Sequence, residues 1–224
     1  MSHTRSGALV VITGSTASGK SSVARMLSKD IGWPYVEFGE LARTRFREYL
    51  ALQHDGGDLQ TFVQDVLWHE HGQDVLALDL LRRVPDHLCL VAVGPRSPAE
   101  IETLRLAGGG RLVLVHLIVP EAVRFARDLK RTWKYEEDRS IGEYSGFGSR
   151  DAIERIWGVE QAGRMSHVLL VRNTSVSLAV RQIVWHLRSL GLPNSDDRKT
   201  TSEQHMDLGG PGFAQLIHAQ WEKW

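Results

Sequence analysis

Residues 8–22 read ALVVITGSTASGKSS, an apolar run that leads into the pattern G-x-x-x-x-G-K-[ST] between Gly14 and Ser21. The run before the pattern predicts a buried strand, and residues 18–30 predict a helix with one apolar face. Glycines let successive backbone N–H groups surround phosphate oxygens, and the N-terminus of the following helix adds positive charge. The stretch therefore predicts a loop that binds the phosphates of a nucleoside triphosphate.

Individual side chains of this loop have expected tasks. Lys20 should reach the β- and γ-phosphates of ATP, and the hydroxyl of Ser21 should help to coordinate Mg²⁺. The expected nucleotide-binding residues are Gly14, Ser15, Thr16, Ala17, Ser18, Gly19, Lys20, Ser21 and Ser22. The competing interpretation is a glycine turn before an ordinary helix, which requires a chance match where strand, loop and helix occur in the right order.

Bulk properties are typical of a small enzyme of the cytoplasm. The chain has 224 residues, and 27 lysines and arginines balance 27 aspartates and glutamates, so no global charge favours nucleic acid or a membrane. A single cysteine excludes a disulfide within the chain. The apolar runs are too short to span a bilayer, and the N-terminus lacks the pattern of a secretion signal. We expect a cytoplasmic protein with a small-molecule partner.

Apolar runs alternate with helical patterns along the chain. Further strands are expected near residues 34–38, 88–93, 111–119 and 167–172. Helices are expected over 18–30, 40–52, 58–70, 73–84, 98–106, 120–132, 150–163 and 175–190. This alternation predicts an α/β fold in which helices cover both faces of a mostly parallel, five-stranded sheet, a three-layer sandwich.

The composition changes after Leu190. Residues 193–224 begin as a polar linker and end in an aromatic stretch that predicts a short tail helix, so the main domain is expected to span 1–192. The tail helix has two open interpretations: docking on its own domain, or a contact with a partner or a second copy. A monomer and a homodimer both remain open.

Two arginines are candidates for binding a phosphorylated acceptor. Arg43 lies one turn into the helix that follows the second strand and the turn at Gly39, although it is equally well explained as a solvated arginine. Arg96 follows the third strand, where open α/β sheets bind ligands. The neighbouring Ser97 and Glu100 form a helix-capping box, whereas no capping rule requires Arg96.

The helix over 120–132 separates charged from apolar residues. One side carries Arg124, Arg127, Arg131 and Lys134. The other side carries Ala122, Phe125, Ala126, Leu129 and Trp133. We expect the apolar side to pack on the domain. The basic side is either solvated or, together with Arg150 beyond the polar segment 135–149, closes over phosphates.

Together these motifs resemble nucleotide kinases. The loop, the turn at 39–43, the segments 94–100 and 150–154 and the basic helix occur in the order seen in the nucleoside-monophosphate kinase superfamily, most like its dephospho-coenzyme-A-kinase-like and archaeal adenylate-kinase-like branch. The resemblance covers about residues 8–190. It implies a P-loop kinase core with an acceptor-binding region at about 39–84 and a lid at about 131–149.

The resemblance also implies residue roles. Gly14 through Ser22 would cradle ATP, Gly39, Arg43 and Arg96 would bind the acceptor, and Arg127, Arg131 and Arg150 would serve the lid. Kinases of this kind usually carry an aspartate near the end of the second or third strand, but the third strand here ends without one.

Glu37 and Glu40 are the nearest substitutes for that aspartate. Either could hold magnesium through water or accept the proton of an attacking hydroxyl, and we favour Glu37 for the metal and Glu40 for catalysis. The alternative roles are a charge at a strand end and an ordinary helix carboxylate.

The expected function is Mg²⁺-dependent transfer of the γ-phosphoryl of ATP to a small phosphorylated acceptor, foremost a nucleoside or deoxynucleoside monophosphate. One alternative is transfer to a free hydroxyl, as in dephospho-coenzyme A or a specialised metabolite. The alternative from another class is a non-catalytic nucleotide-sensing regulator, which the absent strand-end aspartate and the aromatic C-terminus favour.

Overall fold

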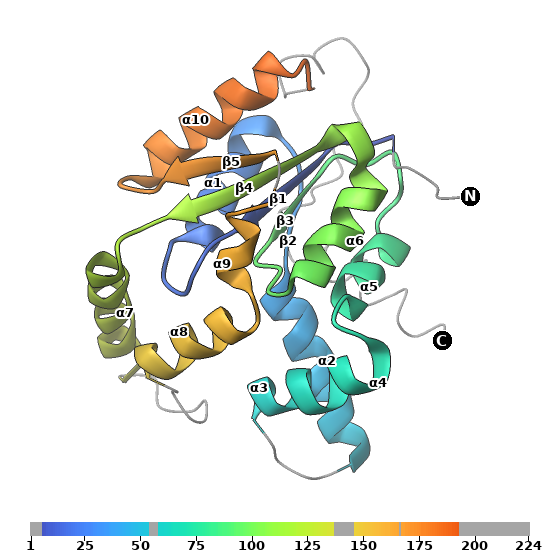
Figure 1. Ribbon diagram of the computed structural model, residues 1–224, viewed down its shortest axis with the longest axis vertical. Helices are drawn as coiled ribbons and strands as arrows, with labels where there is room; N and C mark the ends of the chain where they lie inside the picture. The colour runs from blue at the N-terminus through green and yellow to red at the C-terminus, as the bar shows by residue number, and fades with distance from the viewer. Residues whose placement is uncertain (1–5, 54–57, 137–145, 166, 193–224) are drawn as a thin grey trace.

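The computed structural model describes residues 6–53, 58–136, 146–165 and 167–192 (Figure 1). Within helices, the side chains of residue 53 and of residues 131–136 are also left undescribed. The expected linker and tail helix, residues 193–224, and residues 137–145 of the expected lid therefore lie outside the described residues. The division into a main domain, an acceptor-binding region, a lid and a tail remains a prediction.

A five-stranded parallel sheet forms the middle layer. Its strands are β1 (Leu9–Thr13), β2 (Tyr35–Glu37), β3 (Leu90–Val93), β4 (Leu112–Ile118) and β5 (Val168–Arg172), in the order β2-β3-β1-β4-β5. All five expected strands are confirmed. Ile12 pairs with Val93 on one side and with Val115 on the other, so the carboxyl ends of the central strands lie at one edge.

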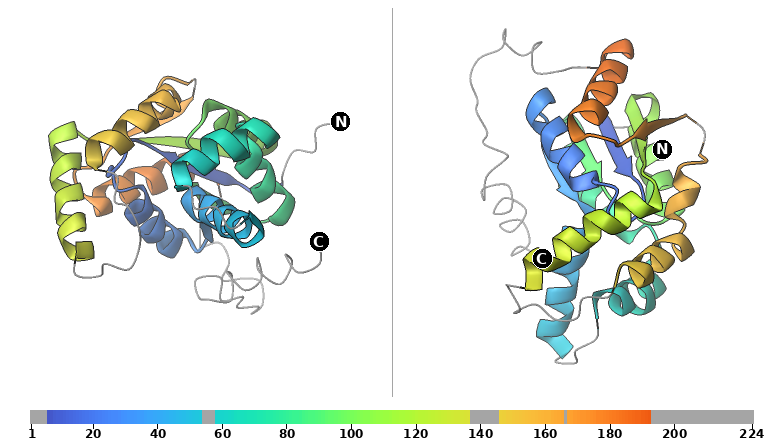
Figure 2. Two further views of the ribbon diagram at one scale, coloured as in Figure 1. Left: turned by 90° about the horizontal axis from the view of Figure 1, so that it is seen from below. Right: turned by 90° about the vertical axis from the view of Figure 1, so that its left-hand side faces the viewer.

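Helices cover both faces of the sheet (Figures 1 and 2). They are α1 (Lys20–Ile31), α2 (Phe38–Gln53), α3 (Leu59–Thr61), the π-helix η1 (Phe62–Trp68), α4 (His69–His71), α5 (Val75–Arg83), α6 (Pro98–Gly108), the 3₁₀-helix η2 (Gly109–Arg111), α7 (Glu121–Glu136), α8 (Phe147–Ile156), α9 (Val159–Ala162) and α10 (Val176–Ser189).

The core has two halves because side chains alternate along the central strands. Val10 and Ile12 of β1 pack with α1 and α10 on one face. Leu9 and Val11 pack on the other face, where α5, α6 and α9 supply the apolar partners. These buried runs explain why the strands are apolar on both sides, which is typical of a parallel sheet.

Two expected helices differ in detail. The expected helix over 58–70 is a continuous run of α3, η1 and α4, with a π-helix in its middle. The expected helix over 150–163 begins earlier and breaks into α8 and α9 at Gly158, whose φ is +90°. A Cβ atom at Gly158 would lie 2.9 Å from the ring of Pro98, so the break also lets α6 approach closely. Among the described residues, no helix is long and apolar enough to span a membrane.

Candidate active site

The phosphate-binding loop joins the end of β1 to the start of α1, as the sequence predicts. Gly14 has a φ of +142° and Gly19 a φ of +88°, conformations that residues with a side chain rarely adopt. A Cβ atom at Gly19 would also lie 2.6 Å from the amide nitrogen of Asn173. The two glycines therefore let the backbone curl tightly in front of the N-terminus of α1.

Lys20 is the first residue of α1, and its side chain folds back over the loop. Its Nζ atom donates hydrogen bonds to the carbonyl oxygens of Gly14 at 2.5 Å and Ser15 at 3.1 Å. These contacts hold the ammonium group inside the loop, next to the backbone that would surround the phosphates.

Charged groups from four other elements act on Lys20. Burial lowers the pKa of Lys20, and Glu154 is the charged group with the largest effect, which raises this pKa. Arg96 and Arg124 lower the pKa further, and Glu37 raises it. The Lys20 ammonium therefore lies near two guanidinium groups and two carboxylates from other parts of the chain, which makes this a strongly polar site at the sheet edge.

The two expected metal ligands lie side by side. Ser21 is the second residue of α1 and Glu37 the last residue of β2, and the Ser21 hydroxyl donates a hydrogen bond of 3.0 Å to Oε2 of Glu37. A hydroxyl oxygen and a carboxylate oxygen are ligands that suit Mg²⁺, which keeps several waters in its octahedral shell. The donor set fits a magnesium ion held at the start of α1.

Arg127 of α7 binds the loop directly. Its guanidinium donates to the carbonyl oxygen of Ser18 at 3.3 Å and to that of Asn173 at 3.0 Å. The buried Asn173 side chain, which follows β5, donates to the same Ser18 oxygen at 2.6 Å. Arg127 therefore reaches the phosphate-binding region, but here its contacts hold the loop to the end of β5.

The expected packing of α7 is wrong. Arg124 and Asp128 of this helix are 5% and 1% exposed, whereas the apolar Phe125 and Leu129 are 46% and 41% exposed. The charged side faces inward because it finds partners there: Arg124 forms a buried ion pair with Asp151 of α8 and donates to a carbonyl of the loop. Paired charges can be buried, so the apolar side is left outside.

A second ion pair joins the same two helices with the charges exchanged: Arg150 of α8 pairs with Asp128 of α7 at 2.6 Å. The two ion pairs thus cross between α7 and α8, which lie next to each other in both views of Figure 2. Arg150 is bound to a carboxylate here, and its expected part in a lid remains a prediction. The side chain of Arg131 lies outside the described part of the chain, and its role stays a prediction too.

Arg43 and Glu40 form a pair on the surface of α2. Their side chains are 43% and 59% exposed and meet at 2.6 Å. A Cβ atom at Gly39 would lie 3.5 Å from the Arg43 guanidinium, so the arginine lies across that turn. Glu40 makes this exposed contact with Arg43, whereas Glu37 contacts Ser21 of the loop. The roles expected for Gly39, Glu40 and Arg43 remain predictions.

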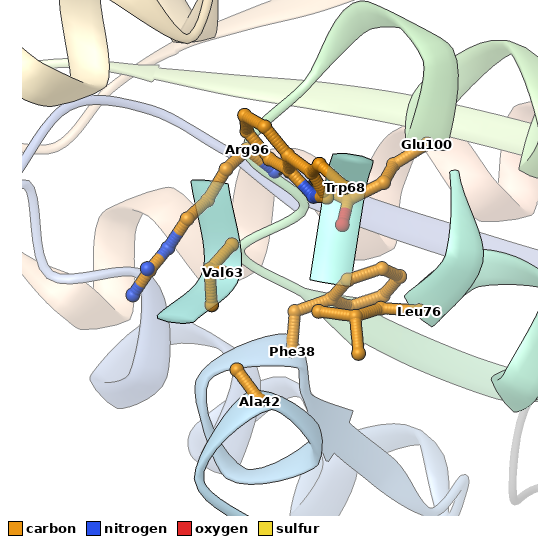
Figure 3. A pocket seen from close by; sticks show the side chains of 7 residues that line it. All are labelled: Phe38, Ala42, Val63, Trp68, Leu76, Arg96 and Glu100. Carbon is orange, nitrogen blue, oxygen red and sulfur yellow. Dashed lines mark hydrogen bonds between the residues drawn. The ribbon is translucent and has the colours of Figure 1, made fainter. Parts of the chain in front are cut away.

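Arg96 borders a small apolar pocket between the end of β3 and α2. The pocket is very small, with a cavity volume of about 10 Å³, which is room for about one water molecule. Its lining consists of Phe38, Ala42, Val63, Trp68, Leu76, Arg96 and Glu100. Figure 3 shows the Arg96 guanidinium pointing away from these apolar side chains. It stacks on the ring of Trp157 at 5.2 Å from the centroid, which ties the pocket to the end of α8.

Glu100 completes the expected capping box at the start of α6. Its Oε2 atom accepts hydrogen bonds from the backbone N–H groups of Arg96 at 2.5 Å and Ser97 at 3.2 Å. Burial raises the pKa of Glu100 to about 7, against the effect of those hydrogen bonds. The same carboxylate therefore fixes the backbone of Arg96 and borders the pocket.

Several residues of the site were not found from the sequence. Asp128 and Asp151 could have been noticed as carboxylates on the two helices that carry the basic residues. Glu154 follows Asp151 by three residues on the same face of α8, and Trp157 comes directly after the end of this helix. Asn173 belongs to no phosphate-binding pattern in the sequence, and only the fold brings it to the loop.

Most of the chain is similar in sequence to UPF0200 proteins. No model of a known protein family matches. The chain is 27% identical over 179 residues to a UPF0200 protein of Methanosarcina barkeri, covering 79% of this chain and 92% of the relative. A 45-residue segment is 44% identical to the cytidylate kinase of Streptococcus gordonii, covering 20% of this chain and 19% of that enzyme.

Solved structures share the fold at low sequence identity. A shikimate kinase from Acinetobacter baumannii in complex with shikimate matches with a TM-score of 0.53 and 14% identity, over 83% of this chain and 95% of that one. A gluconokinase from Sinorhizobium meliloti matches with a TM-score of 0.50 and 19% identity, over 83% and 94%. The chain therefore has an α/β P-loop kinase-like fold and is similar in sequence to UPF0200 proteins.

Proposed function

We propose that this protein is a phosphotransferase that uses Mg²⁺ and ATP to phosphorylate a small acceptor. The observation that carries the proposal is the arrangement at the start of α1, where Lys20 lies inside a glycine loop and Ser21 contacts Glu37. This arrangement supplies a cation for the migrating phosphoryl group and oxygen ligands for a metal, the two requirements of phosphoryl transfer. The fold shared with kinases is consistent with this proposal.

Residue roles follow from the contacts. Lys20 would bind the β- and γ-phosphates, and the backbone of residues 14–22 would surround them. Ser21 and Glu37 would hold Mg²⁺, which neutralises phosphate charge when bound. Arg127 would keep the loop attached to the end of β5, so that the loop is in position for a nucleotide. Arg150 would keep α8 attached to α7.

The proposed acceptor carries an anionic group. The Arg96 guanidinium lies outside the apolar lining of the small pocket, so it would offer a cation to the phosphate of an acceptor. A nucleoside or deoxynucleoside monophosphate has this chemistry and is our first candidate. Dephospho-coenzyme A, which is phosphorylated on a hydroxyl, is the second.

The test is a titration of ATP into the protein followed by an acceptor panel. ATP should bind in a Mg²⁺-dependent manner and lose affinity in Lys20→Ala, and ADP should form only when an acceptor is added. Tight ATP binding without transfer to any acceptor would favour the alternative of a nucleotide-sensing regulator.

A further inference from the structure

Residues of α8 and its C-terminal end connect the phosphate-binding loop with Arg96, the residue proposed to bind the acceptor. Asp151 and Glu154 lie three residues apart on α8 and so share a face of the helix, and Trp157 follows directly after the last residue of α8. Asp151 pairs with Arg124, which donates to a carbonyl of the phosphate-binding loop. Trp157 lies under the guanidinium of Arg96 at the acceptor pocket. Along the helix, Glu154 lies between the residue that pairs with Arg124 and the residue that stacks on Arg96, and its carboxylate is close enough to act on the Lys20 ammonium.

The Glu154 carboxylate has an open hydrogen-bonding position. Its Oε2 atom is buried, and within the described residues no group donates a hydrogen bond to it. A buried carboxylate oxygen without a donor is costly, so a bound group that donates a hydrogen bond would be stabilised there. Glu37, the other carboxylate near Lys20, already accepts the Ser21 hydroxyl. Of these two carboxylates, only that of Glu154 has a buried oxygen that receives no hydrogen bond from the described residues.

We propose that Glu154 accepts the proton of an acceptor hydroxyl, so that the group phosphorylated by this protein is an alcohol rather than a phosphate. The inference rests on the transfer from ATP proposed above, and it places dephospho-coenzyme A, which offers a hydroxyl, ahead of nucleoside monophosphates that would be phosphorylated on their phosphate. In this step the acceptor O–H bond breaks and its proton moves to Glu154. The oxygen forms a bond to the γ-phosphorus while the bond from that phosphorus to the β,γ-bridging oxygen breaks, and ADP leaves with the electron pair.

Charge favours the same choice of acceptor. A phosphate acceptor brings negative charge toward a carboxylate and needs no base, whereas a hydroxyl is neutral and must lose a proton. The charged groups that act on the Lys20 ammonium together with Glu154 are Arg96 after β3, Arg124 of α7 and Glu37 of β2. Burial lowers the pKa of His116 of β4, the Lys20 ammonium lowers it further, and Glu160 of α9 raises it. An acceptor can still carry an anionic group elsewhere, at Arg96.

The experiment compares wild type, Glu154→Gln and Glu154→Asp. Each protein is incubated with Mg²⁺ and ATP and with AMP, CMP, dephospho-coenzyme A, ribose 5-phosphate or water alone as acceptor. Phosphorus NMR distinguishes a new phosphate monoester, made from a hydroxyl, from a new phosphoanhydride, made from a phosphate. Thermal unfolding and ATP binding are measured for every variant, and Glu121→Gln, an exposed carboxylate of α7, is the matched control.

We expect phosphate monoester products. The kcat of Glu154→Gln should be lower than that of wild type by about 100-fold or more, with ATP affinity retained. Glu154→Asp should keep part of the activity, and only variants with the carboxylate should show the rise of rate with pH that marks a general base. A phosphoanhydride product, or a Glu154→Gln kcat within a few-fold of wild type, would overturn this inference and leave the phosphotransferase proposal intact. Absence of transfer with ATP bound would overturn both.

Discussion

Replacing Glu100 by Gln should remove a pH dependence of stability that the wild-type protein carries. Glu100 is 1% exposed, and burial raises its pKa from 4.5 to about 7. Between these two values the folded state binds more protons at this carboxyl than the unfolded state does. Stability therefore falls as the pH rises through this window, and a shift of this size corresponds to about 3 kcal/mol at most.

Urea unfolding at about pH 4 and about pH 8 measures the effect, since the window from 4.5 to about 7 lies between these two pH values. Glutamine keeps the side chain's shape and can accept the hydrogen bonds from the backbone of Arg96 and Ser97, but it does not titrate. We expect wild type to lose up to about 3 kcal/mol more than Glu100→Gln between the two pH values. Glu102→Gln, which changes an exposed carboxylate of α6, should follow wild type. Parallel pH dependences for wild type and Glu100→Gln would refute the reasoning.

Three further substitutions test the loop, the metal site and the crossed ion pairs. Gly19→Ala should cost about 1–3 kcal/mol in unfolding experiments and weaken ATP binding, because its φ is +88° and the new Cβ meets Asn173; Gly110→Ala, where a Cβ meets nothing within 4 Å, should be neutral. Glu37→Gln should raise the Mg²⁺ concentration needed for half-maximal turnover by about 10-fold or more, and unchanged Mg²⁺ dependence would contradict the metal assignment. Asp151→Asn should cost about 3 kcal/mol by leaving Arg124 buried without its carboxylate, and a loss below 1 kcal/mol would show that the pair is not needed.

Local patterns predict the sheet and the loop because their causes are local. The runs at 8–13 and 88–93 are apolar on both sides, which only a strand between two layers of helices explains. The phosphate-binding loop is equally local, because its glycines are needed for the backbone path itself and Lys20 follows directly. These parts could be predicted without knowledge of any distant contact.

The orientation of α7 could not be predicted in this way. Its apolar stripe indicates a packed face, but Arg124 is buried instead because Asp151, 27 residues further along the chain, supplies a charge partner. A periodicity argument assigns arginine to the surface by default and has no means to see such a pair. The same limitation hid Glu154, which matters because the fold brings its carboxylate close enough to act on the Lys20 ammonium.

The most direct test of the central claim measures ADP formation from Mg²⁺ and ATP in wild type and in Lys20→Ala, with nucleoside monophosphates, deoxynucleoside monophosphates and dephospho-coenzyme A as acceptors. The account predicts acceptor-dependent ADP formation by wild type and none by a Lys20→Ala variant that unfolds at the wild-type temperature. ADP formation at the wild-type rate by folded Lys20→Ala, or ATP binding with no transfer to any acceptor, would contradict it.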